Sequence, residues 1–236
     1  MDWIQVYSID MKKVFAIAAC VLAMSSCVFS YSGDMGKKVK CKGPVITKDF
    51  DLTGFEAITI NGGADMEIIQ GDEIKVSVKA NEEVFNHLDY EVSGSTLIIK
   101  TKDDVGIRAE EYDITVTLPL LTAITVNGAG DLDIKNGYVC DNDLEIEING
   151  AGDIEMTGVT VPSLAVYLNG AGDIDANDLN VEKLSVHISG AGDVDVSGKA
   201  SSAIFSVSGA GDIDARNLDC NDVQTSKSGI ASIRLK

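Results

Sequence analysis

NGAGDLDI at residues 127–134 is the first of five near-identical phrases whose spacing decides the fold. The other four are NGAGDIEM at 149–156, NGAGDIDA at 169–176, SGAGDVDV at 189–196 and SGAGDIDA at 208–215. Successive copies begin 22, 20, 20 and 19 residues apart. A constant period near 20 residues, with no helical pattern between the copies, predicts a solenoid of stacked β-coils.

The residues within each repeat alternate in the manner of a β-strand. Leu164 and Val166 point to one face, while Ala165 and Tyr167 point to the other. The GAG triplet is predicted to be a sharp corner, because glycine reaches positive φ without steric cost. The glycines expected at these corners are Gly128, Gly130, Gly150, Gly152, Gly170, Gly172, Gly190, Gly192, Gly209 and Gly211.

Stacked coils place equivalent residues above one another, which predicts a buried row of aliphatic side chains. This row is Leu132, Ile154, Ile174, Val194 and Ile213. NGGADMEI at 61–68 matches the phrase with one glycine displaced, and SGIASIRL at 228–235 is a decayed last copy, preceded by Lys227 at an inward position. A polar final repeat suits a solenoid cap. We therefore expect an all-β, parallel β-solenoid over residues 46–236, with less regular coils over 46–122 and regular repeats over 123–236.

Residues 1–27 are predicted to be an export signal of the lipoprotein type. Two lysines precede the apolar segment 14–24, which is too short to span a bilayer but suits a signal peptide. The small residues of MSSC are typical of a lipoprotein signal, so Cys27 is the predicted lipid attachment site. Lipidation at Cys20, within IAAC, and plain secretion with cleavage near Ser26 are the alternatives.

Residues 28–45 are polar and rich in lysine, which predicts a flexible tether between the anchor and the folded region. Export makes disulfides possible. Cys140 and Cys220 occupy equivalent positions four coils apart, and at about 4.8 Å per coil they are separated by roughly 19 Å. Because a disulfide needs Cα atoms within about 7 Å, these two do not pair with each other. Whether Cys41 pairs with either stays open.

Two columns of carboxylates are the chemical feature of the repeats. The first column is Asp131, Asp153, Asp173, Asp193 and Asp212, and the second is Asp133, Glu155, Asp175, Asp195 and Asp214. Like charges at the coil spacing repel, and either backbone amides or bound cations would offset that repulsion. We expect structural bonds from turn amides to the first column, with a weak Ca²⁺ ladder or a ligand-binding surface as the alternatives and no other cofactor.

The Asn and Ser residues that open each phrase have two interpretations. They either bind sugar or form hydrogen bonds along the stack and to the turn backbone, and we favour the structural interpretation. These residues are Asn127, Asn149, Asn169, Ser189 and Ser208.

Several function classes are disfavoured by the sequence. The net charge of −18 opposes binding to nucleic acid. His87 and His187 lie far apart with no zinc-ligand spacing around them, and the GAGD phrase does not open a helix as a dinucleotide fingerprint does. The single Trp is Trp3, inside the predicted leader, so the mature chain has no Trp platform for sugars.

The segments FEAITINGGADMEI at 55–68, 70–101 and ITVTLPLLTAITVNGAGDLDI at 114–134 carry a family resemblance. They resemble the family described as "putative auto-transporter adhesin, head GIN domain", exported β-helical proteins common in Bacteroidetes. The resemblance covers the chain from about Phe50 onward. It implies a right-handed parallel β-helix and a role in surface adhesion, and it brings no established catalytic residues.

The sequence thus predicts a non-catalytic cell-envelope lipoprotein, attached to the outer membrane through its lipid alone and facing the periplasm or the cell surface. Its β-helix is expected to bind a protein or glycan, or to act as a rigid spacer. Two alternatives are a polysaccharide-active β-helix enzyme and an envelope scaffold or signalling protein. The enzyme is disfavoured because Lys199 and Arg216 are isolated beside the carboxylate columns.

Overall fold

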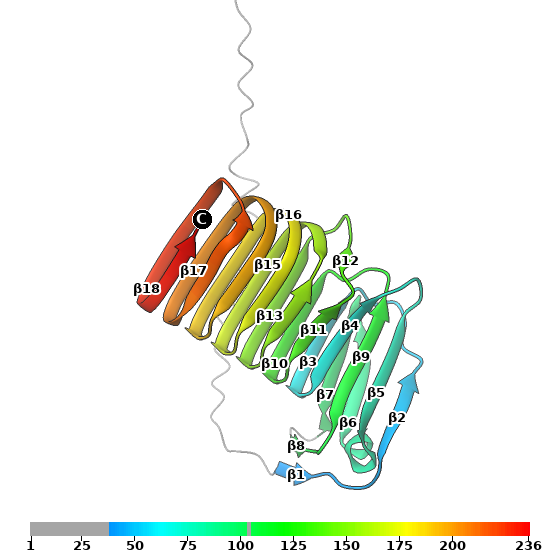
Figure 1. Ribbon diagram of the computed structural model, residues 1–236. Helices are drawn as coiled ribbons and strands as arrows, with labels where there is room; N and C mark the ends of the chain where they lie inside the picture. Colours follow the sequence, from blue (N-terminus) through cyan, green and yellow to red (C-terminus); the bar gives the residue numbers. More distant parts are fainter. Residues whose placement is uncertain (1–37, 103–104) are drawn as a thin grey trace, which may run out of the picture. The chain divides into compact units, whose positions relative to one another are not determined.

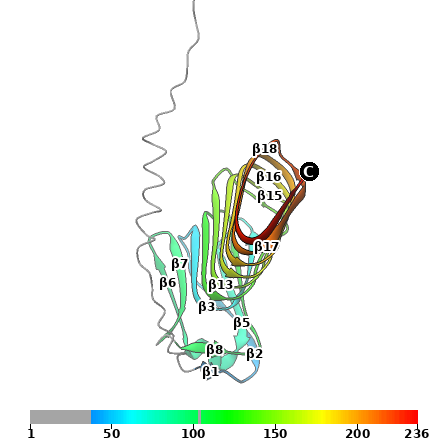
Figure 2. The same cartoon turned by 90° about the vertical axis from the view of Figure 1, so that its left-hand side faces the viewer.

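The computed structural model describes residues 38–102 and 105–236, which form a β-solenoid of about six turns with coils of about 20 residues (Figure 1). The predicted solenoid is therefore confirmed. Figure 2 looks along the stack and shows the coils from β13 to β18 superimposed around a common interior. The signal-peptide and lipidation predictions for residues 1–27 lie outside the described residues.

Nine strands make the regular part of the stack, and neighbouring coils pair in parallel. Their register aligns like with like: Asn149 lies opposite Asn169, and Asn169 opposite Ser189. The strands are β10 (Ala123–Ala129), β11 (Leu132–Lys135), β12 (Tyr138–Val139), β13 (Leu144–Ala151), β14 (Ile154–Thr157), β15 (Val159–Ala171), β16 (Ile174–Ala191), β17 (Val194–Asp219) and β18 (Asp222–Leu235).

The corner falls later in the phrase than the sequence suggests. Strand β10 continues through Ala129, and Gly128 keeps its ladder position opposite Gly150. The chain turns only at Gly130 and Asp131, before β11 begins at Leu132. The first glycine of each triplet is thus a strand residue. Glycine is required there by the packing between coils as well as by the φ angle.

The elements before the regular repeats include nine strands and one short 3₁₀ helix. They are β1 (Lys38–Lys40), β2 (Val45–Phe50), β3 (Ala57–Gly63), β4 (Asp65–Gln70), β5 (Lys75–Asn81), η1 (Glu82–Asn86), β6 (Leu88–Ser93), β7 (Thr96–Thr101), β8 (Gly106–Arg108) and β9 (Tyr112–Leu118).

The displaced phrase NGGADMEI forms a full coil, although it is followed by a long interval before the next copy. Strand β3 pairs in parallel with β10 on one side and β7 on the other, and β4 pairs likewise with β11 and β9. This early coil therefore lies between two layers that come later in the chain. Spatial order along the stack differs here from sequence order.

The prediction of less regular coils over 46–122 is only partly right. Strands β7 and β9 extend the parallel stack, but β2, β5 and β6 run antiparallel to their neighbours. These three strands close the N-terminal end of the sheet as hairpin-like additions (Figure 1). Alternating apolar residues support either strand direction, so the pattern alone could not distinguish a coil from an antiparallel cap.

The tether predicted for residues 28–45 does not extend as far as expected. Strand β1 pairs with β8, the Cys41 side chain is only 2% exposed, and its N–H donates to the Arg108 carbonyl at 2.9 Å. Residues 38–45 thus belong to the folded region. The rest of the predicted tether lies outside the described residues.

The core is a set of aliphatic rows inside the coils, as the alternation predicts. The row of Leu132, Ile154, Ile174, Val194 and Ile213 is at most 1% exposed, and Met66 of β4 extends it. No single coil buries its inner face alone, so stability arises from stacking. At the C-terminal end Lys227 lies opposite Val207, as predicted for a decayed last repeat, and Ser232 lies opposite Asp212.

Candidate functional site

The glycine columns bring the backbones of successive coils into close contact. A Cβ atom built on Gly170 would lie 1.7 Å from the carbonyl oxygen of Gly150, and one on Gly172 would lie 2.0 Å from that of Gly152. Gly170 and Gly172 also have φ of 155°, a conformation that side chains oppose. The phrase therefore requires glycine at both positions, because any side chain there would separate the coils.

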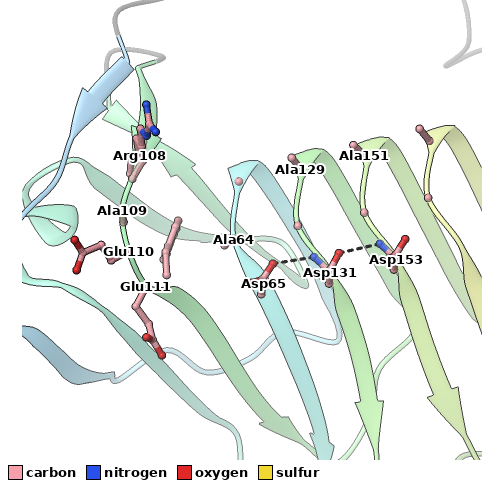
Figure 3. A pocket seen from close by; sticks show the side chains of 17 residues that line it. Ala64, Asp65, Arg108, Ala109, Glu110, Glu111, Ala129, Asp131, Ala151 and Asp153 are labelled. Carbon is pink, nitrogen blue, oxygen red and sulfur yellow. Dashed lines mark hydrogen bonds between the residues drawn. The ribbon is translucent and has the colours of Figure 1, made fainter.

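The first Asp column forms a continuous hydrogen-bonded ladder between coils. The Asp131 N–H donates to Oδ1 of Asp65 at 3.0 Å, and the Asp153 N–H donates to Oδ1 of Asp131 at 2.9 Å (Figure 3). The same bond continues at 2.7–3.1 Å through Asp173, Asp193, Asp212 and the N–H of Ser232. Each carboxylate thus accepts the corner amide of the next coil.

This ladder supplies the amide bonds that the sequence predicts for the first column, with two differences. The donor belongs to the adjacent coil rather than to the carboxylate's own turn. The ladder also begins one coil earlier, at Asp65, which the five clean phrases do not include. NGGADMEI differs from the clean phrase by an exchange of alanine and the second glycine, and its aspartate stands at the same fifth position.

The Asn side chains that open the phrases form a second ladder. Nδ2 of Asn127 donates to Oδ1 of Asn61 at 2.8 Å, Asn149 to Asn127 at 3.0 Å, and Asn169 to Asn149 at 2.9 Å. These bonds support the structural interpretation. Nδ2 of Asn169 also donates to Oε1 of Glu147 at 3.4 Å.

The second carboxylate column is neutralised at its ends rather than throughout. Lys135 lies 3.2 Å from Glu67 and 3.3 Å from Asp133. At the other end Arg216 bonds Asp214, which lowers the pKa of that carboxyl to about 2. Arg216 is therefore not the isolated cation that the sequence suggests. It is an ion-pair partner.

The middle of the second column keeps unbalanced negative charge. Burial raises the pKa of Asp175, and the charges of Asp195, Asp173 and Asp153 raise it further. No group of three or more His, Cys, Asp or Glu side chains arranged to hold a metal ion is present within residues 38–102 and 105–236.

An open groove of about 760 Å³ runs along the corners of the first coils (Figure 3). Its floor consists of the exposed methyl groups of Ala129 and Ala151, the glycine backbone beside them, and the Asp ladder. The segment 107–112, from the end of β8 to the first residue of β9, forms its wall. Arg108 is the one cationic side chain lining the groove among the described residues.

A buried amide holds this wall in place. The Asn81 side chain is 2% exposed, and its Oδ1 accepts the N–H groups of Glu110 at 2.8 Å and Glu111 at 3.3 Å. Its Nδ2 donates to the Gly43 carbonyl at 3.0 Å. Lys79 bonds Glu111, and this bond is the main cause of the lowered pKa of that carboxyl. Sequence reasoning missed the groove because its wall and floor come from distant segments.

The three described cysteines are free. Cys41 is buried, and burial raises the pKa of its thiol, with a further contribution from Glu83. The structure forms no disulfide between Cys140 and Cys220 and joins neither of them to Cys41.

The stacked parallel coils and their bonded corners define a repeat protein of the β-solenoid class. The chain belongs to the family described as "putative auto-transporter adhesin, head GIN domain", whose sequence profile matches residues 54–236. Among curated proteins, none matches the chain. Across residues 38–102 and 105–236, no helix is long and apolar enough to cross a membrane.

Solved structures with the same fold come from Bacteroides and Parabacteroides species. A protein of Bacteroides fragilis described as a putative adhesin has a TM-score of 0.69 and 22% identity, over 84% of this chain and all of its own. A Parabacteroides distasonis protein described as a putative lipid binding protein has a TM-score of 0.73 and 23% identity over the same shares. A putative adhesin from that species has a TM-score of 0.72 and 22% identity, over 84% of this chain and 85% of its own. At these identities the structural likeness shows the shared fold alone.

Proposed function

We propose that the chain is an exported, lipid-anchored and non-catalytic envelope protein that binds a protein or glycan ligand in the groove above its corners. The observation that carries this proposal is the groove itself. The Asp ladder holds its floor, the Asn ladder joins the same coils two residues before the floor alanines, and buried Asn81 holds its wall. A rigid floor loses little conformational freedom when a ligand binds.

The state of the first-column carboxylates supports binding rather than catalysis. A catalytic acid or base needs a carboxyl that is available to the substrate proton. In the first column each carboxylate already accepts a backbone amide, as Asp153 does from Asp173 at 2.7 Å. Membership of a family described as putative adhesins also supports a binding role.

An array of glycans and matrix proteins, probed with a soluble 28–236 fragment with and without calcium, tests the binding role. The decisive variant is Ala151→Trp, which places a large ring on the groove floor. Ala210→Trp is the matched control, because Ala210 has the same exposed corner position but lies outside the groove. We expect an array ligand whose binding is lost in Ala151→Trp and retained in Ala210→Trp. Binding that survives both substitutions would place the ligand elsewhere.

The anchor is tested by a separate experiment on the full chain. The proposed lipid on Cys27 supplies the multiple acyl chains that stable attachment needs. Cys27→Ala is expected to move the protein from the membrane fraction to the soluble fraction. Cys20→Ala, which removes the alternative lipidation site, is expected to leave it with the membranes. Retention of the Cys27 variant in the membrane fraction would show that the anchor is wrongly assigned.

A further inference from the structure

Two ring-bearing side chains stand together on the outer face of the regular repeats. Residues 123–236 contain only four Phe, Tyr or His residues, and two of them, Tyr138 and Phe205, are fully buried. The other two, Tyr167 and His187, occupy adjacent coils in register. Their ring centroids are 5.1 Å apart and their planes differ by 8°, so the rings stack face to face along the solenoid axis.

The stack ends abruptly on the side nearer the C-terminus. The next two positions in this column are Ser206 on β17 and Ser226 on β18. A serine side chain is far smaller than a ring, so the outer face of the His187 imidazole is not covered by a neighbour of its own column. A third ring above His187, at the level of Ser206, would continue the stack at the spacing between Tyr167 and His187.

The groups around this vacant position combine one apolar side chain with several hydrogen-bonding side chains. Ile204, in the neighbouring outward column, is 41% exposed. Ser206, Ser226 and Gln224 present hydroxyl and amide groups that both donate and accept. Burial lowers the pKa of His187, so its imidazole is uncharged at neutral pH and offers a neutral π-face.

We propose that this surface, the shelf formed by His187, Ile204, Ser206, Gln224 and Ser226, binds one pyranose ring of a neutral glycan. The C–H groups on one face of a pyranose carry partial positive charge and are attracted to the negative face of an aromatic ring. The sugar hydroxyls bond the serine and glutamine side chains. The overall charge of −18 and the carboxylates Glu145 and Glu147 beside Tyr167 disfavour acidic sugars.

The shelf is separate from the corner groove, and it uses none of the groove residues. A purely structural role for the ring pair is the competing explanation, because stacked neighbours on adjacent strands stabilise sheets. The two roles predict different behaviour for Ser206→Tyr. A third ring would extend the stack and keep or increase stability, but it would fill the position that the sugar needs.

The test measures binding of three neutral oligosaccharides to the purified full chain by saturation-transfer NMR and by titration. The probes are cellohexaose, maltohexaose and the hexamer of N-acetylglucosamine. At least one probe is expected to bind with a dissociation constant of about 1 mM or lower. His187→Ala and Ser206→Tyr should each weaken that binding by about tenfold. Thr125→Ala, in the same column but away from the ring pair, should leave it unchanged.

Three outcomes would overturn the proposal. The first is that none of the three oligosaccharides binds at about 10 mM, a concentration that detects even weak sites. The second is that binding persists in both His187→Ala and Ser206→Tyr. The third is that oligogalacturonate or the aromatic probe N-acetyltyrosinamide binds at the shelf more tightly than any neutral sugar, which would indicate a different ligand class.

Discussion

At the scale of single residues, the repeated phrase works through close backbone contact. Each glycine lets one coil approach the next, and each Asp then bonds the amide that this approach brings near. In the second column the same proximity has a cost, because Asp175 has charged neighbours and no cation. The sequence predicts the identity of these residues, since the period is plain. It does not reveal that the Asp bonds cross between coils.

The glycine requirement leads to a stability prediction. Gly170→Ala would place a methyl group 1.7 Å from the Gly150 carbonyl oxygen, so the backbone must move, and we expect a loss of at least about 3 kcal/mol of unfolding free energy. Gly94→Ala is the control, because its φ is 61° but nothing lies within 4 Å of the added atom. It should cost only about 1–2 kcal/mol. Urea unfolding measures both, and equal losses would contradict the contact between coils.

The raised pKa of Asp175 leads to a prediction about pH. Because the folded chain binds this proton more tightly than the unfolded chain, stability falls as the pH rises from the ordinary Asp value through the raised one. Asp175→Asn removes this loss and should raise the urea midpoint at pH 7. At pH 3, below the ordinary Asp pKa of about 3.9, wild type and variant should be equally stable. A gain of the same size at both pH values would rule out titration of Asp175 as its source.

At the scale of strands and coils, alternation predicts which side chains face inward. The aliphatic row from Leu132 to Ile213 is buried as expected. The decayed last repeat around Lys227 also lies at the end of the stack, as expected. The N-terminal cap was not predictable in the same way, because IKVSV at 74–78 alternates identically in parallel and antiparallel strands. The groove could not be predicted from the sequence either, because the pairing of β3 with both β7 and β10 follows from tertiary packing.

The alternation is tested by comparing an inward and an outward substitution. Ile174 is 1% exposed, so Ile174→Ala should cost about 2–5 kcal/mol through lost burial and the cavity left behind. Tyr167→Ala removes an outward ring that contacts His187, and should cost about 0.5–1.5 kcal/mol. Denaturant unfolding of the two variants gives the comparison. A Tyr167 variant as damaged as the Ile174 variant would contradict the assigned faces.

At the scale of the whole molecule, the chain carries a net charge of −18 and yet stacks carboxylates directly above one another. The corner amides offer one compensation that is present in every regular coil. Bound cations offer another, and they would make stability depend on calcium through linkage. The choice between them decides whether the solenoid is rigid by itself or depends on bound cations.

Thermal unfolding of wild type, Asp173→Asn and Asp173→Ala, each in millimolar calcium and in EDTA, tests this compensation most directly. If the Asp193 amide holds the carboxylate, Asn accepts the same 2.8 Å bond and should be nearly neutral, while Ala should cost about 0.5–1.5 kcal/mol. Neither effect should depend on calcium, and chelation should leave the wild-type Tm unchanged. A calcium-dependent rise of several degrees in wild type that Asp173→Asn reduces would contradict the amide ladder and identify the Asp column as a cation site.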